Sequence, residues 1–103
     1  MRRAARVDAN QKDVVQRFIS HGCSVTLLHR VGEGCPDLLV GLNGQTLLVE
    51  VKDGTKTPSQ QAKTPAQVRW WSEWKGGPVA TINDLAGVDT ICAMLKTFPR
   101  STG

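Results

Sequence analysis

The sequence predicts one α/β domain whose elements follow the order αβββαβα. The clearest observation is a β-hairpin: two apolar segments, residues 37–42 and 45–52, flank Asn43-Gly44, a dipeptide typical of a two-residue type I′ turn. Apolar residues also recur at helical spacing before and after this hairpin. A chain of 103 residues has room for a single hydrophobic core. Residues 1–103 are therefore expected to form one domain.

Three helices are expected from apolar spacing and from signals at their ends. The first covers residues 9–21, where apolar side chains follow a helical period. The second begins with Thr64 as its N-cap and Pro65 as its first residue. The third is capped by Asn83 or Asp84 and again shows apolar residues at helical spacing. All three are amphipathic and are expected to pack against the sheet.

The remaining segments are two strands and two polar stretches. β-branched and apolar residues predict strands at residues 24–29 and 78–82, in addition to the hairpin. Residues 53–64 are polar, contain Pro58 and show no periodicity, so we expect an exposed and mobile loop there. Residues 1–7 contain three arginines and are expected to form a flexible basic arm.

Composition and charge exclude several classes of protein. The net charge of +4 and the pI near 9.3 favour polyanionic partners without requiring them. The longest apolar stretches are far shorter than the roughly 20 residues of a membrane span, and the basic start lacks the apolar run of a signal peptide. We therefore expect an intracellular protein without membrane contact. Three cysteines without a Cys-x-x-Cys pair favour reduced, buried thiols, and two histidines are too few to suggest a structural zinc site.

A polar group on one face of the hairpin gives the first indication of function. Counting back from the Asn43-Gly44 turn, Asp37 lies opposite Glu50. Directly opposed side chains share a face of the sheet, and Lys52, two residues beyond Glu50, points to the same face. The opposite face receives apolar side chains that can pack against helices: Leu38, Val40, Leu47, Val49 and Val51.

Two opposed carboxylates repel each other unless a cation neutralises them. Oxygen ligands select hard ions, so the pair predicts a Mg²⁺ or Mn²⁺ site. Such an ion polarises a phosphoryl oxygen and lowers the pKa of a bound water, and Lys52 could stabilise the charge that develops. A structural alternative stays open, in which Asp37 caps a turn after Pro36 while Glu50 and Lys52 face solvent. A β-bulge would separate the two carboxylates.

Pro36-Asp37, twelve further residues and then Glu50-Val51-Lys52 match the PD-(D/E)XK signature. Residues 34–41 (GCPDLLVG), 48–52 (LVEVK) and 64–71 (TPAQVRWW) together resemble the VRR-NUC (virus-type replication-repair nuclease) family of that superfamily, particularly its small stand-alone phage and prophage members. The resemblance extends over about residues 8–95. It implies a restriction-endonuclease-like αβββαβ core, in which helices flank a mixed central sheet, plus a C-terminal helix.

The resemblance also implies a reaction and assigns residues to it. The reaction is metal-dependent hydrolysis of phosphodiester bonds in DNA, in the cytoplasm of a bacterium or a phage-infected host. Asp37 and Glu50 would be metal ligands, the Val51 carbonyl would complete the metal site, and Lys52 would be catalytic.

Two glutamines match further family positions near the active site. Gln11 matches a first-helix glutamate that helps to bind metal, and its lack of charge weighs against a second ion. Gln67 matches a glutamine of the second helix that lies near the active site. Each also fits a capping box, Gln11 with Asp8 and Gln67 with Thr64, and both interpretations stay open.

Three clustered tryptophans admit three interpretations: core packing, base stacking or a subunit contact. Trp71 and Trp74 share a helical stripe with Val68, which favours core packing, whereas Trp70 points elsewhere and is expected to be exposed. A surplus tryptophan on a small domain also favours dimerisation. Because related stand-alone nucleases resemble two-fold dimers that act on branched DNA, we expect a homodimer.

Basic side chains that border the site in sequence, or lie in the amino-terminal arm, are expected to contact DNA phosphates. They are Lys56, Lys63, Arg69, Arg2, Arg3 and Arg6. Ordinary solubilising charge is the alternative for any one of them. The residues therefore predict a Mg²⁺- or Mn²⁺-dependent DNA endonuclease that prefers branched DNA such as four-way (Holliday) junctions. The alternatives are a catalytically silent nucleic-acid-binding module on the same fold and a structural homodimer that uses the tryptophans.

Overall fold

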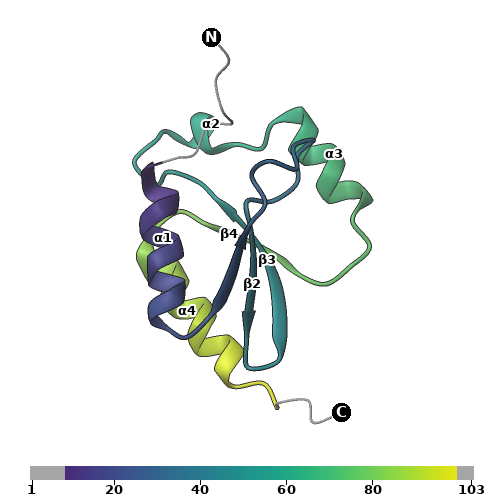
Figure 1. Cartoon of the computed structure of the whole chain (residues 1–103). Helices are drawn as coiled ribbons and strands as arrows, with labels where there is room; N and C mark the ends of the chain where they lie inside the picture. Colours follow the sequence, from purple (N-terminus) through teal and green to yellow (C-terminus); the bar gives the residue numbers. More distant parts are fainter. Residues whose placement is uncertain (1–8, 100–103) are drawn as a thin grey trace.

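The computed structural model of the chain describes residues 9–99, and its elements follow the predicted order with one addition (Figure 1). The elements are α1 (Ala9–Ser20), β1 (Ser24–Leu27), β2 (Leu38–Leu42), β3 (Gln45–Val51), α2 (Pro58–Gln61), α3 (Pro65–Glu73), β4 (Val79–Ile82) and α4 (Leu85–Lys96). The basic arm with Arg2, Arg3 and Arg6, together with Asp8 and its capping box, lies outside the described residues. Within residues 9–99, no helix is long and apolar enough to cross a membrane.

The four strands form one mixed sheet in the order β1-β2-β3-β4. The first three strands are antiparallel neighbours, and β4 runs parallel to β3. Asn43 and Gly44 have φ values of 55° and 75°, the left-handed conformation that a type I′ turn requires. Leu42 pairs with Gln45 and Leu38 pairs with Val49, so the predicted hairpin register is confirmed and contains no bulge.

Helices α1 and α4 lie side by side on one face of the sheet, where they cover the hydrophobic core (Figure 1). The apolar hairpin residues predicted for this face are all buried there. The helices contribute Val14, Phe18, Val88, Cys92 and Leu95. Cys23 and Cys92 are buried, free thiols whose sulfur atoms lie 3.7 Å apart, which confirms the prediction for these two cysteines.

Helix α3 lies beyond the end of the sheet, on the side away from α1 and α4, and none of its residues is buried (Figure 1). The prediction of core packing is therefore wrong for Trp74, which is 43% exposed, and for Val68, which is 54% exposed. Trp71 is only partly buried, and Trp70, expected to be exposed, is partly buried as well. The reason is that α1 and α4 already fill the core, which leaves α3 to cover the polar end of the hairpin.

Most element bounds differ from the predictions by a single residue, and two segments differ by more. The strand expected at residues 24–29 ends at Leu27, because a turn closed by a 2.9 Å hydrogen bond from the Val31 N–H to the Leu28 carbonyl follows it. The loop expected at residues 53–64 contains α2, whose N-cap is Thr57. Thr57 and Gln60 form a capping box that stabilises this single helical turn.

Candidate active site

The predicted polar group lies where β3 ends, on the face of the sheet away from the core. Asp37 directly precedes β2, one register step beyond the Leu38–Val49 pair of the hairpin. Its Oδ2 accepts a hydrogen bond of 2.8 Å from the Val51 N–H on β3. Because Leu38 and Val51 point into the core, their neighbours Asp37, Glu50 and Lys52 point to the other face. The hairpin therefore fixes both carboxylates on one face.

Glu50, Lys52 and Gln67 form a closed polar cluster in which each side chain contacts the other two. The Gln67 Nε2 donates to Glu50 Oε2 at 2.6 Å, and Lys52 Nζ donates to Gln67 Oε1 at 3.0 Å. Lys52 Nζ lies 3.4 Å from Glu50 Oε2. Glu50 and Lys52 are therefore not the solvent-facing strand residues of the structural alternative.

The Glu50 carboxyl is 3% exposed, and its charged form is disfavoured in the free protein. Burial, and next the negative charge of Asp37, raise the pKa of Glu50 to about 7, although Lys52 and Gln67 oppose the shift. Its Oε1 is buried and has no hydrogen-bond partner among residues 9–99. An unpaired, buried carboxylate oxygen beside a second carboxylate is the arrangement that a cation would satisfy.

The donor set fits a hard divalent cation that keeps part of its water shell. Within the described part of the chain, no group of three or more His, Cys, Asp and Glu side chains could hold a metal ion. Side-chain ligation would therefore come from Asp37 and Glu50, with water and substrate oxygens at the remaining positions. Mg²⁺ is bound in this way, through one or two carboxylates and substrate phosphates.

A solved structure described as a VRR_NUC domain matches this chain with a TM-score of 0.60 and 32% sequence identity. The match covers 81% of this chain and 89% of that chain. The chain belongs to the VRR_NUC family. No family model and no curated protein matches the sequence. VRR_NUC membership confirms the fold class and makes this a nuclease-type domain of the PD-(D/E)XK superfamily.

Gln67 joins the candidate site to helix α3, and it both contacts that site and caps the helix. Its Oε1 accepts from the Thr64 N–H at 3.0 Å, while its own N–H donates to the Thr64 Oγ1 at 3.2 Å. These bonds form the capping box of α3. The same Oε1 accepts from Lys52, and the Nε2 holds Glu50. The start of α3 is therefore fixed to Glu50 on β3 and to Lys52, which directly follows the strand.

The loop between β1 and β2 contacts α3 and brings a residue that was not predicted close to the candidate site (Figure 1). At Gly34, φ is +83°, and an added Cβ would lie 2.2 Å from the Ala66 carbonyl oxygen. Cys35 follows and is half-buried, contrary to the prediction that all cysteines are buried. Burial, then the charges of Asp37 and Glu50, raise the pKa of the Cys35 thiol. Cys35 lies two residues before Asp37, and residues two apart in an extended segment point to the same face. This spacing is the sequence signal that could have placed Cys35 near the site.

The other predicted site residues are placed as follows. Gln11 is buried in α1 at 4% exposure, and its neighbour Asn10 donates from Nδ2 to the Lys52 carbonyl at 2.9 Å. Lys56, Lys63 and Arg69 are exposed. Metal binding by the Val51 carbonyl and by Gln11, and DNA binding by the three basic residues, stay predictions.

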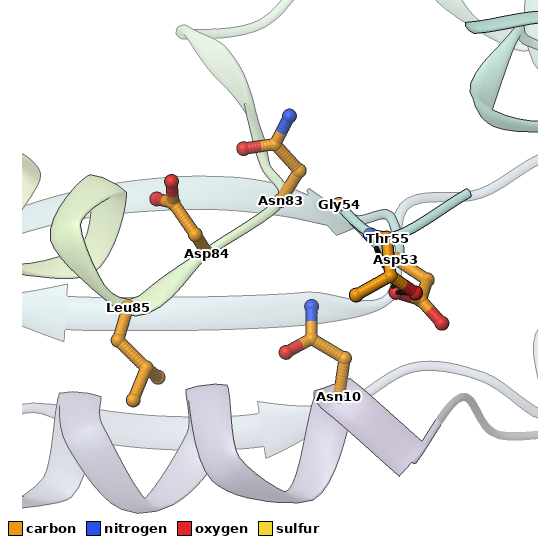
Figure 2. Close-up of a pocket in the computed structure, with 7 residues that line it drawn as sticks. All are labelled: Asn10, Asp53, Gly54, Thr55, Asn83, Asp84 and Leu85. Atoms are coloured by element: carbon orange, nitrogen blue, oxygen red, sulfur yellow. Dashed lines mark hydrogen bonds between the residues drawn. The ribbon is translucent and has the colours of Figure 1, made fainter. Parts of the chain in front are cut away.

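A pocket of about 420 Å³ lies beside the ends of β3 and β4 (Figure 2). Figure 2 shows Asn10 on α1 and Asp84 before α4 on opposite sides of it. The pocket contains two carboxylates, and each stabilises local structure. Asp53 accepts hydrogen bonds from the Thr55 N–H and hydroxyl, and Asp84 accepts one from the Gly87 N–H as the N-cap of α4. The lining residues are Asn10, Asp53, Gly54, Thr55, Asn83, Asp84 and Leu85. None of the four polar residues of the candidate site lines it, so this pocket is separate from that site.

Proposed function

We propose that this VRR_NUC chain is a divalent-metal-dependent DNA endonuclease that hydrolyses phosphodiester bonds. The observation that carries the proposal is the buried, unpaired Oε1 of Glu50 beside Asp37, with Lys52 in contact with the same glutamate. A silent module with this fold would gain nothing from a buried carboxylate whose charge the free protein destabilises. A nuclease would gain a site for a hard cation.

The residues divide the work of such a site. Asp37 and Glu50 would hold Mg²⁺ or Mn²⁺, together with the Val51 carbonyl. A bound ion would polarise a phosphoryl oxygen and lower the pKa of a coordinated water. The Lys52 ammonium supplies a positive charge beside the carboxylates, where negative charge develops on the phosphate. Gln67 holds Lys52 and Glu50 in their relative positions.

The substrate and the assembly are part of the proposal. Exposed Lys56, Lys63 and Arg69 would bind DNA phosphates on either side of the site. A homodimer would present two such sites, and this arrangement suits branched or junction DNA. The competing functions are a silent DNA-binding module and a structural homodimer.

Cleavage of end-labelled linear, flapped and four-way-junction DNA tests the proposal. We expect the wild-type protein to cut in Mg²⁺ or Mn²⁺ and not in EDTA, and we expect Asp37→Asn and Lys52→Ala to abolish cutting. A branched substrate, flapped or four-way, should be cut faster than linear DNA. Binding without cutting in every metal would support the silent module. No binding, together with a dimer in solution, would support the structural role.

Replacing Gln67 by alanine should lower kcat by about ten- to a hundredfold, because Lys52 and Glu50 lose the side chain that holds them. The matched control is Gln60→Ala, which removes the same capping-box partner from α2. Single-turnover cleavage and thermal melting of both variants separate the two roles. Equal losses of kcat in the two variants would mean that Gln67 acts only as the cap of its helix.

A further inference from the structure

Trp70 and Trp74 form an aromatic stack on the surface of α3. Their ring centroids are 4.9 Å apart and the ring planes are inclined by 16°. Trp74 remains 43% exposed in this arrangement. A large, partly exposed aromatic surface on a domain whose core is complete needs an explanation other than packing.

The stack is held in a fixed position. The Trp74 Nε1 donates to the Gly77 carbonyl at 2.8 Å, so the only polar atom of this indole is already bonded. Gly76 contacts the ring so closely that a Cβ added there would lie 2.3 Å from it. The Trp74 ring is thus rigid and presents apolar, aromatic surface without an unpaired donor. Such a surface binds a flat, aromatic partner with little loss of conformational entropy.

Basic residues outnumber acidic ones along the segment that carries the stack. Arg69 and Lys75 lie within α3 or directly after it, and Glu73 is the one acidic residue between them. Lys63 precedes the helix and lies over the Trp71 ring, with its Nζ 4.2 Å from the ring centroid. A second copy of this face would bring like charges together, whereas a polyanion would be attracted. Aromatic rings among cations are the combination that binds single-stranded nucleic acid.

The position of the stack relates it to the candidate active site. Trp74 is the C-cap of α3 and lies seven residues beyond Gln67, which is close to two full helical turns, so the two residues start from the same side of the helix. The separation along the helix axis is about 10 Å. Gln67 contacts Glu50 and Lys52 directly. A DNA strand that passes the catalytic residues could therefore reach the stack within a few nucleotides.

We infer that the Trp70–Trp74 stack binds an unpaired base of the substrate strand next to the cleavage site. The inference rests on the proposed nuclease function and narrows its substrate class to DNA with unpaired nucleotides beside the scissile bond. A paired base cannot stack on these rings, because its neighbours in the duplex cover both of its faces. An unpaired base can offer one face to an aromatic side chain.

The test compares two DNA probes in EDTA by fluorescence anisotropy: a blunt duplex and the same duplex with an unpaired six-nucleotide extension. We expect Trp74→Ala to weaken binding of the extended probe about tenfold and binding of the blunt duplex less than twofold. Trp74→Phe, which keeps a ring for stacking, should lie within about threefold of wild type for both probes. Phe98→Ala is the matched control, because Phe98 is 44% exposed and lies after α4.

The outcomes separate the inference from the proposed function, since cleavage by the wild-type protein is measured in parallel. A loss of affinity in Trp74→Ala that is confined to the extended probe supports the inference. An equal loss of affinity for both probes, or no loss for either, overturns it even if the wild-type protein cuts DNA. If Trp74→Ala loses affinity only for the extended probe but the wild-type protein cuts no DNA in any metal, the stack binds unpaired bases and the proposed nuclease function is wrong. A self-associating surface would instead show a change of molecular mass in Trp74→Ala, which also overturns the inference.

Discussion

Replacing Glu50 by glutamine is expected to lower DNA cleavage at least about a thousandfold and, at the same time, to stabilise the metal-free protein at pH 8. The loss of cleavage follows from removing one of two carboxylates that would hold the cation. The gain in stability follows from removing a buried charge whose Oε1 has no partner among the described residues. Loss of activity with a gain in stability is typical of a residue kept for function.

The pH dependence of stability gives the sign and size of this effect. Burial and Asp37 raise the pKa of Glu50 from 4.5 to about 7, so the folded state binds more protons than the unfolded state between these values. The free energy of unfolding of the wild-type protein therefore falls as pH rises from about 4.5 to 7. The decrease in the free energy of unfolding that Glu50 causes over this pH range is on the order of 3 kcal/mol. Glu50→Gln has no such proton and should lack this part of the slope.

Urea unfolding in EDTA at several pH values measures the effect as the difference between variant and wild type, which cancels other titrating groups. Glu73→Gln is the control, because Glu73 is an exposed carboxylate on α3. Adding Mg²⁺ at pH 8 should stabilise the wild-type protein and leave Glu50→Gln unchanged. A stability difference that does not grow between pH 5 and 8 would contradict the raised pKa of Glu50.

The carboxylate pair was predictable because a local signal fixes a long-range register. Asn43-Gly44 specifies a two-residue turn, and the turn determines which residues of the two strands are opposed. Asp37 and Glu50 follow from counting. Their environment did not follow, because strand alternation does not say that α3 would cover Glu50 and bury it to 3% exposure. The pKa of Glu50 depends on that tertiary contact.

The tryptophans mark the limit of periodicity as evidence. The spacing of Val68, Trp71 and Trp74 predicts a helical segment, and α3 covers most of it, but the spacing does not say what its apolar residues face. In this fold α1 and α4 fill the core, and α3 turns Gln67 toward Glu50 and Lys52 instead. Apolar residues on α3 are left at the surface as a consequence.

The short helix α2 was predictable from a signal already used elsewhere in the chain. Thr57-Pro58-Ser59-Gln60 repeats the pattern of Thr64-Pro65-Ala66-Gln67, and both segments form capping boxes with proline in the first turn. The polar composition of residues 53–64 obscured the first of them. The second segment contacts the candidate site, because Gln67 is hydrogen-bonded to Glu50 and Lys52, whereas Gln60 bonds within its own capping box.

Replacing Gly34 by alanine is expected to destabilise the protein by about 2–4 kcal/mol and to lower cleavage about a hundredfold. The added Cβ would lie 2.2 Å from the Ala66 carbonyl oxygen and 2.7 Å from the Gln67 nitrogen, and both are backbone atoms that no rotamer change can move away. Either the loop or the start of α3 must shift. Because Gln67 holds Glu50 and Lys52, a shift of α3 disturbs the candidate site.

The variant Gly32→Ala distinguishes the steric effect of the Gly34 contact with α3 from the effect of backbone strain in the same loop. Gly32 has a φ of +76°, close to the +83° of Gly34, but a Cβ there would meet no atom within 4 Å. Its replacement should cost only the strain of a left-handed alanine, about 1 kcal/mol, and leave cleavage near the wild-type rate. Urea unfolding and single-turnover cleavage of both variants measure the difference. Equal effects in the two variants would mean that α3 does not depend on the loop, and that Gln67 reaches the site without its support.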